Sequence, residues 1–477
     1  MKKGQDQQSP GFLRYIILLL ACIALYGNMF IFDQPALLKE QIVQTYSPIY
    51  GEHLTNFYFS FMYSFYSIPN IILPLVGGFM SDVFGKLRIY ANLGYRKMSL
   101  IFMFFVILGQ GFLYFGSSVA NLKYMILGRF MFGLGGESLC VASSIIINKW
   151  FVGKELSFAN ALNLSLIRSA TVLGTYISPR IAEKSGMTTA FGVGFGITLI
   201  SGAALLVMNF IDSYSEILQK RNLQKTEGLL DNSMQVLDFG ELVKQIMEDI
   251  GTFPKIFWIL TLIMTTFYTS VLIFISFSSG IIINLWLSAD APIEQNQEVA
   301  GELMGIPYLC CTFLSPFVGL MIDKVGQRIK FLAIGCALVF LGLLLMLLFY
   351  PIFCMLTLGL AYALFASTIW TSIAFQNLII QRGTAFGVMN SVQNFAFFVM
   401  PLFIAFISAE ASSQVSVVLF FLILACVSLI IAIYLYIEDR NRIVSLNSSD
   451  QKKLMNYVNN RTEDGEEFEE EEIIETK

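Results

Sequence analysis

Long apolar runs separated by short polar stretches dominate the chain. A helix needs about 20 consecutive apolar residues to cross a bilayer, and roughly twelve runs reach that length. The runs cover residues 13–33, 57–80, 98–119, 122–147, 156–180, 188–211, 256–287, 300–322, 330–350, 352–377, 384–408 and 415–437. The pattern predicts an all-α polytopic membrane protein with twelve transmembrane helices.

One long hydrophilic stretch divides these helices into two sets of six. Within it, LDFGELVKQIMEDIG has apolar residues at helical spacing with charges between them. This favours an amphipathic helix on the membrane surface, and a flexible linker with a partly helical end is the alternative. We predict five regions in order: a cytosolic N-terminal tail (1–12), an N-terminal six-helix half (13–211), a cytosolic linker with this helix (212–255), a C-terminal six-helix half (256–437) and an acidic, disordered cytosolic tail (438–477).

Composition and charge agree with a membrane protein. Hydrophobic residues make up 56% of the chain and charged residues 13%, whereas soluble proteins carry about 25% charged residues. If the N-terminus is cytosolic, two of the 30 Lys and Arg residues lie within spans, and the outside loops hold Lys39, Lys123, Arg180 and Lys184. Positive charge collects on the cytosolic side of membrane proteins. Both termini are therefore predicted to be cytosolic.

The sequence contains no set of residues typical of an enzyme. All seven cysteines fall within predicted spans, and none has the spacing of metal ligands. Neither a nucleophile–base set nor the spacing of a Walker A motif is present. We therefore predict no enzymatic activity, no metal and no cofactor. The expected partners are the lipid bilayer and a small-molecule substrate, not nucleic acid.

A short motif recurs at the same place in each half. G-x-x-x-D-x-x-G follows the second predicted span in GFMSDVFGK and the eighth in GLMIDKVGQR. Paired six-helix halves with a site between them are typical of secondary transporters. An Asp at a helix end can meet a helix N-terminus or a basic side chain, which predicts a cytosolic latch that breaks when that side opens. A charged turn is the plainer interpretation. The latch residues are Gly78, Asp82, Gly85, Gly319, Asp323, Lys324, Gly326 and Arg328.

Charged residues inside the predicted spans are few and are candidates for function. A charge at the centre of a span costs at least about 2.5–3.5 kcal/mol. The clear cases are Arg129, Glu137 and Arg168, with Asp33 at the outer end of the first span. Arg129 and Glu137 lie about 12 Å apart along one helix and about 80° apart around it. They are not expected to pair directly.

Glu137 and Arg168 lie near the middle of neighbouring spans, and two interpretations compete. In the first, the two residues form one interhelical ion pair that locks the bundle. In the second, they are the two poles of a site for a zwitterion, with the carboxylate for an amine and the guanidinium for a carboxylate. Arginine suits the second role because its planar fork binds carboxylate through two parallel hydrogen bonds. The residues alone leave both interpretations open.

Several motifs resemble one known family. The latch motif and the R-x-x-x-G-x-G pattern that begins at Arg129 resemble signatures of the major facilitator superfamily, although Val83 replaces a basic residue in the first latch copy. Over about residues 12–440 the chain resembles the lysosomal dipeptide transporter branch of that superfamily. The motifs that carry this resemblance occur in the order FDQPALL, GRFMFGLGGESL, WFVGKEL, SLIRSATV, MIDKVG and GTAFGVMNSVQN.

The resemblance implies a major facilitator fold and facilitated, alternating-access transport of dipeptides across a lysosomal or endolysosomal membrane. It implies that Glu137 binds the amino terminus of the substrate and that Arg168 binds its carboxylate. Arg129 is associated in the superfamily with proton coupling or with support of the cavity, and we favour support. The branch uses a glycosylated accessory membrane protein. Such a partner would protect this chain, whose predicted outside loops contain no N-x-[ST] sequon.

Further residues are second-tier candidates for the cavity, and other functions stay open. Each of these residues also has a plainer role: a helix cap for the Asp, packing for the aromatic residues, and bonds between helices for the amides. A proton carrier would have to be Glu137 or Asp33, and we favour passive transport. The alternatives are a proton-coupled porter of another organic anion or amino acid, and a non-transporting nutrient receptor or scaffold. The second-tier set is Asp33, Arg129, Tyr268, Trp370, Gln393 and Asn394.

Overall fold

The described part of the chain contains helices and no strand in the computed structural model. The structure describes residues 12–85, 91–151, 154–223, 250–251, 253–288, 290–325, 327–376, 382–410 and 414–440. The helices are α1 (Leu13–Ile31), α2 (Gln34–Leu37), α3 (Lys39–Tyr50), α4 (Glu52–Gly85), α5 (Ala91–Ser118), α6 (Leu122–Trp150), α7 (Lys154–Ser185), α8 (Met187–Leu223), α10 (Lys255–Tyr268), η1 (Thr269–Ile273), α11 (Phe274–Trp286), α12 (Ile293–Val325), α13 (Arg328–Leu348), α14 (Pro351–Gln376), α15 (Arg382–Glu410) and α16 (Val415–Arg440).

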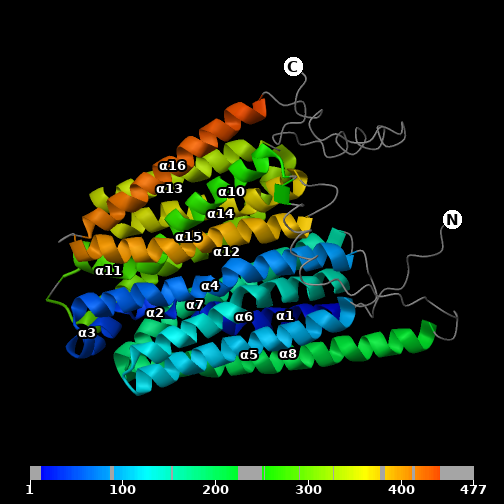
Figure 1. Ribbon diagram of the computed structural model, residues 1–477, viewed down its shortest axis with the longest axis horizontal. Coiled ribbons are helices and arrows are strands. Elements are labelled where there is room, and N and C mark those ends of the chain that lie inside the picture. Colours follow the sequence, from blue (N-terminus) through cyan, green and yellow to red (C-terminus); the bar gives the residue numbers. More distant parts are fainter. Residues whose placement is uncertain are drawn as a thin grey trace.

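The predicted twelve-helix architecture is confirmed. Eleven helical segments of the described residues are long and apolar enough to cross a membrane. The twelfth is α7, which has 32 residues but a more polar composition and stands at the place of the fifth predicted span. Figure 1 shows the helices running roughly parallel, with the N-terminal half in blue to green beside the C-terminal half in green to orange.

The first membrane-crossing helix of each half is interrupted. In the N-terminal half, Phe32 and Asp33 separate the end of α1 at Ile31 from the start of α2 at Gln34, and Pro35 lies in the first turn of α2. Proline has no backbone N–H and disfavours a helical conformation in the residue before it. In the C-terminal half, the π-helical turn η1 separates α10 from α11. Such turns are frequent at functional sites.

Glycines allow the helices of the N-terminal half to pack closely around α6. A Cβ atom at Gly133 would overlap the carbonyl oxygen of Tyr66 on α4, and one at Gly135 would overlap that of Phe102 on α5. Small residues at helix interfaces let two backbones approach within a membrane. Gly133 and Gly135 of GRFMFGLGGESL therefore serve helix packing.

The two halves touch near both ends of the bundle. Toward one end, α15 packs against α4, where Gly387 lies against the backbone of Pro74. Toward the other end, α7 packs against α12, and Arg180 forms ion pairs with Glu298, at 2.7 Å, and with Glu302. We refer to this arrangement of the halves, joined through α4 with α15 and α7 with α12, as the closed conformation.

A buried ionic cluster joins three helices of the N-terminal half. The Asp212 carboxylate has no exposed surface and accepts hydrogen bonds from Lys149 Nζ at 2.9 Å and from Trp150 Nε1 at 2.7 Å. Arg96 of α5 also pairs with it. The boundary predicted between residues 211 and 212 thus falls inside α8, which continues to Leu223. Most of the predicted amphipathic helix, residues 237–249, lies outside the described residues.

We expect Asp212→Asn to destabilise the folded protein. The substitution removes the carboxylate that two cationic side chains share, and breaking a buried ion pair typically costs about 3–5 kcal/mol. Thermal unfolding of the purified protein in detergent should show a markedly lower Tm. The control is Glu438→Gln, which removes an exposed pair with Lys255 at 3.3 Å and should have little effect. Equal Tm values for the two variants would contradict this role for Asp212.

Candidate functional site

Arg129 is enclosed in the interior of the N-terminal half. Its side chain has no exposed surface, and its guanidinium carbon lies 4.9 Å from the ring centre of Tyr63, 5.1 Å from that of Tyr66 and 5.3 Å from that of Phe132. Nη1 donates a hydrogen bond to the carbonyl oxygen of Phe32 at 3.0 Å. That carbonyl lies just past the end of α1, where backbone oxygens lack helical partners. Arg129 therefore supports the break between α1 and α2.

Asp33 lies at the same break, and it does not cap a helix. It occupies the position before α2, but its side chain makes no capping hydrogen bond. The interpretation of Asp33 as a helix cap is therefore wrong. The residue is 2% exposed, and no described residue forms a well-aligned hydrogen bond to either carboxylate oxygen. The hydroxyls of Tyr308 and Ser276, both from the C-terminal half, face this carboxyl, and Arg129 and Arg168 lie within electrostatic range.

Glu137 connects the two halves. Asn394 on α15 donates a hydrogen bond from Nδ2 to Glu137 Oε2 at 2.9 Å, and the Tyr66 hydroxyl lies beside the same carboxylate. No ion pair of Glu137 with Arg129 or with Arg168 occurs among the described residues. The spacing of Arg129 and Glu137 predicts the first absence. Because Glu137 and Arg168 do not form an ion pair here, no contact in the described structure supports the interpretation that they lock the bundle.

Arg168 reaches from α7 toward aromatic residues of the C-terminal half. Its guanidinium carbon lies 5.4 Å from the ring centre of Tyr362 and 6.0 Å from that of Tyr308. Tyr268 is also within electrostatic range, and its ring packs edge-on against Tyr362 at 6.0 Å. The second-tier candidate Tyr268 therefore lies beside Arg168. Tyr308 and Tyr362 were not predicted, because their sequence surroundings do not separate them from the many aromatic residues that pack within spans.

Glu137 and Arg168 flank the same part of the interior without touching. Both act electrostatically on the thiol of Cys140, which lies one helical turn beyond Glu137 on α6. Their nearest groups differ in chemistry. Glu137 meets a neutral amide and a phenol, whereas Arg168 meets aromatic rings. The arrangement leaves an anion and a cation separately available to a ligand that carries both opposite charges.

A small cavity lies beside the break between α1 and α2, and neither Glu137 nor Arg168 lines it. A cavity of about 20 Å³ lies between Arg129, Tyr66 and Ser276, with the π-helical residues Leu272 and Ile273 in its wall. Such a volume holds about one water molecule, whereas ligand pockets are typically about 300–1,000 Å³. This cavity is therefore too small for a ligand of that size.

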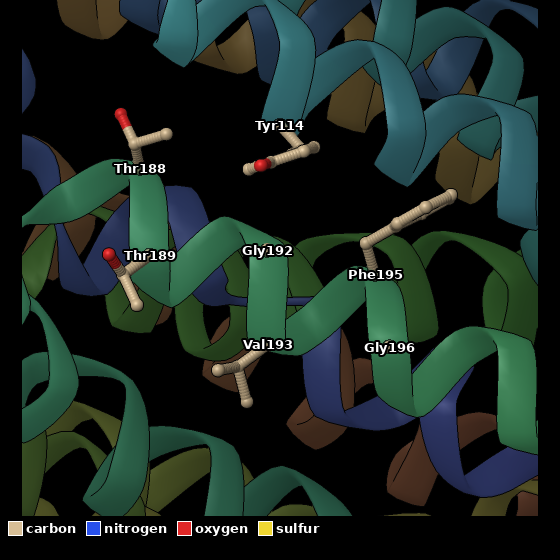
Figure 2. A pocket seen from close by; sticks show the side chains of 7 residues that line it. All are labelled: Tyr114, Thr188, Thr189, Gly192, Val193, Phe195 and Gly196. Atoms are coloured by element: carbon tan, nitrogen blue, oxygen red, sulfur yellow. The ribbon is translucent and has the colours of Figure 1, made fainter.

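A larger pocket lies elsewhere and lacks charged side chains. Figure 2 shows it between Tyr114 of α5 and the beginning of α8, which contributes Thr188, Thr189, Gly192 and Phe195. Its volume is about 420 Å³, and none of the predicted site residues lines it. It is therefore not the candidate site for a charged substrate.

The remaining predicted residues are only partly described. Gln393 is 9% exposed and has a buried Oε1 without a partner among the described residues. The backbone of Trp370 lies in α14, but its side chain is outside the described part. The two latch motifs end the equivalent helices α4 and α12, which agrees with the internal repeat. Gly319 lies in α12 and Arg328 begins α13; Gly326 and the side chains of Asp82, Asp323 and Lys324 are outside the description, as are the surroundings of Gly78 and Gly85.

Comparisons with known proteins agree with this architecture. The protein named Lysosomal dipeptide transporter MFSD1 of Danio rerio is 29% identical over 451 residues, which cover 91% of this chain and 89% of that protein. The Homo sapiens protein of the same name is 28% identical over 448 residues, covering 92% and 89%. These similarities confirm the resemblance to that branch.

Solved structures show the fold independently. The crystal structure of an auto-inhibited peptide transporter of the POT family has a TM-score of 0.61 at 12% identity, covering 90% of this chain and 99% of that one. A POT peptide transporter in complex with sulfate has a TM-score of 0.62 at 11% identity, covering 88% and 93%. The family description Major Facilitator Superfamily matches residues 15–289 and 270–461. The chain belongs to the Major Facilitator Superfamily.

Proposed function

We propose that this protein is a secondary transporter that moves dipeptides across a lysosomal membrane by alternating access. One observation supports the proposal: Glu137 and Arg168 both lie within electrostatic range of Cys140, and no ion pair joins them among the described residues. A dipeptide is a small zwitterion whose ends carry the opposite charges. Two relatives of this chain are named lysosomal dipeptide transporters.

The substrate is held by its two termini. The dipeptide carboxylate binds the guanidinium of Arg168 through parallel hydrogen bonds, a geometry that a lysine ammonium does not reproduce. The dipeptide ammonium donates to the carboxylate of Glu137. Tyr268, Gln393 and Asn394 complete the cavity, and Arg129 supports its wall. Because the fixed contacts go to the termini, this arrangement accepts many side chains.

The cellular setting follows from charge and from the relatives. The distribution of Lys and Arg supports a cytosolic position for both termini. The latch residues Asp82 and Asp323 then lie on the cytosolic side and hold it closed in part of the cycle. A glycosylated accessory membrane protein covers the lumenal face. Transport is facilitated diffusion down the dipeptide gradient, with no chemical conversion of the substrate.

A proton-coupled porter is the second candidate. The buried carboxyl of Asp33, which lacks a fully formed hydrogen bond among the described residues, favours it. Intramembrane carboxyls of this kind serve as proton carriers in many transporters. In that case the substrate is another organic anion or amino acid, and proton uptake drives its movement.

Replacing the two charged residues should weaken recognition of the two substrate termini separately. We expect saturable uptake of a labelled dipeptide into proteoliposomes that contain the wild-type protein. Glu137→Gln and Arg168→Ala should each lower affinity by about tenfold or more, since hydrogen bonds to charged groups contribute about 1.5–3 kcal/mol. A dipeptide with a C-terminal amide should compete poorly with the labelled dipeptide for uptake by the wild type. Arg168→Ala should not weaken binding of this amide any further.

Folding and specificity controls belong to the same measurement. Glu438→Gln should transport at the wild-type rate, and all variants should match the wild type in size-exclusion profile. Absence of saturable dipeptide uptake by well-folded protein would overturn the proposed function. Wild-type affinity in both site variants would overturn the site assignment and leave dipeptide transport standing.

A pH gradient separates the two candidate functions. For facilitated diffusion, the final dipeptide distribution across the liposome membrane should be equal with and without an imposed gradient, and Asp33→Asn should leave this result unchanged. For proton coupling, the gradient should drive accumulation in the wild type, and Asp33→Asn should abolish it. Accumulation against the dipeptide gradient is therefore the result that contradicts passive transport.

A further inference from the structure

The amide of Asn394 is oriented by two acceptors. Its Nδ2 donates to Glu137 Oε2 at 2.9 Å and to the backbone carbonyl of Asn390 at 3.0 Å. Because both of these partners are oxygen atoms, the nitrogen of the amide must face them and the oxygen must point away. The side chain is 1% exposed, and its Oδ1 is buried without a hydrogen-bond partner among the described residues.

This hydrogen bond joins an ionisable side chain of one half to an amide of the other half. Glu137 belongs to α6 of the N-terminal half and Asn394 to α15 of the C-terminal half. A hydrogen bond to a carboxylate is stronger than one between neutral groups. It therefore favours the closed conformation, in which α6 and α15 approach each other.

A substrate ammonium and the Asn394 amide need the same acceptor. Both are N–H donors, and Glu137 offers only oxygen acceptors when it is ionised. A bound ammonium takes the place of Nδ2 at Glu137, and rotation of the displaced amide turns Oδ1 toward the ammonium as an acceptor for a second N–H. The ligand would thus satisfy a buried oxygen that otherwise carries a free-energy cost.

We propose that Asn394 is a positioning residue that substitutes for the substrate's ammonium at Glu137, so that the carrier can close and return without a dipeptide. The inference rests on the proposed function, because it assigns the ammonium of a dipeptide to Glu137. A uniporter must reorient unloaded in each cycle of net transport. A buried carboxylate left with the Tyr66 hydroxyl as its neighbouring donor would oppose that step, and the Asn394 amide supplies a second donor from the other half.

The proposal distinguishes two modes of transport. Net uptake into dipeptide-free liposomes requires the unloaded carrier to reorient, whereas exchange of external labelled dipeptide for internal unlabelled dipeptide does not. In Asn394→Leu, we expect net uptake to fall by about tenfold or more, the effect of losing one charge-assisted hydrogen bond. Exchange should fall by a smaller factor, so the ratio of exchange to net uptake should rise.

A matched variant controls for loss of a buried asparagine. Asn209 on α8 is 7% exposed, donates from Nδ2 to the Arg96 carbonyl and to Ser99, and likewise has an Oδ1 without a partner among the described residues. It does not contact Glu137. Asn209→Leu should leave the ratio of exchange to net uptake unchanged. A ratio in Asn394→Leu equal to that of the wild type would overturn the proposal.

A second measurement does not depend on transport. Hydrogen–deuterium exchange of the full-length protein in detergent, with no dipeptide added, reports the stability of the closed conformation. Asn394→Leu should speed exchange of backbone amides around Glu137 and around Asn394, and Asn209→Leu should not. Unchanged exchange there would overturn the role of Asn394, even if the transport assay finds a different substrate. If the wild type does not transport dipeptides but Asn394→Leu shows faster hydrogen–deuterium exchange, the proposed function alone is overturned.

Discussion

The cost of placing charge in an apolar interior governs the organisation of this molecule. Asp212 shows the fully compensated case, with a cation from each of two neighbouring helices and an indole N–H on one carboxylate. Glu137 and Asp33 show the opposite case. Glu137 meets neutral donors, and Asp33 lacks a completed hydrogen bond within the described structure. The compensated charge lies within one half, and the less compensated charges lie where the halves meet.

This distribution connects folding with transport. A charge satisfied within one half adds stability that does not change when the halves move. A charge at the boundary depends on what the other half, or a ligand, brings to it. Arg168 illustrates this dependence, because the aromatic rings that surround its guanidinium belong to α12 and α14 of the C-terminal half. Movement of the halves therefore changes the surroundings of Arg168 directly.

The lengths of the apolar runs, and the long hydrophilic stretch between two sets of six, were sufficient to predict the helices in two halves. Apolar length sets where a chain can cross a membrane, so ten of the predicted spans coincide with single long helices and two with interrupted ones. Helix geometry also separated Arg129 from Glu137. Helix geometry did not reveal the partner of Arg129. The carbonyl of Phe32 can accept a bond from Arg129 because α1 ends just before Phe32, and that break was not predicted.

Contacts between distant segments were beyond the reach of pattern analysis. The hydrophilic pattern predicted that Asp212 begins a polar linker, yet its partners Arg96, Lys149 and Trp150 are more than 60 positions away and meet it only through folding. Asp33 stands where a capping residue is common, but its side chain is directed toward Tyr308. Asn394 was one of several amides in spans. What distinguishes Asn394 is its hydrogen bond to the carboxylate of Glu137, a residue 257 positions earlier in the chain.

The interruptions in the first helix of each half have a mechanical consequence. One lies between α1 and α2, where Phe32 accepts the bond from Arg129, and the other is the π-helical turn η1. Leu272 and Ile273 of that turn line the same cavity as Phe32. A continuous helix transmits a tilt at one end to the other end, like a lever. A jointed helix can bend at the level of the cavity, so the two ends of the passage can open independently, one at a time.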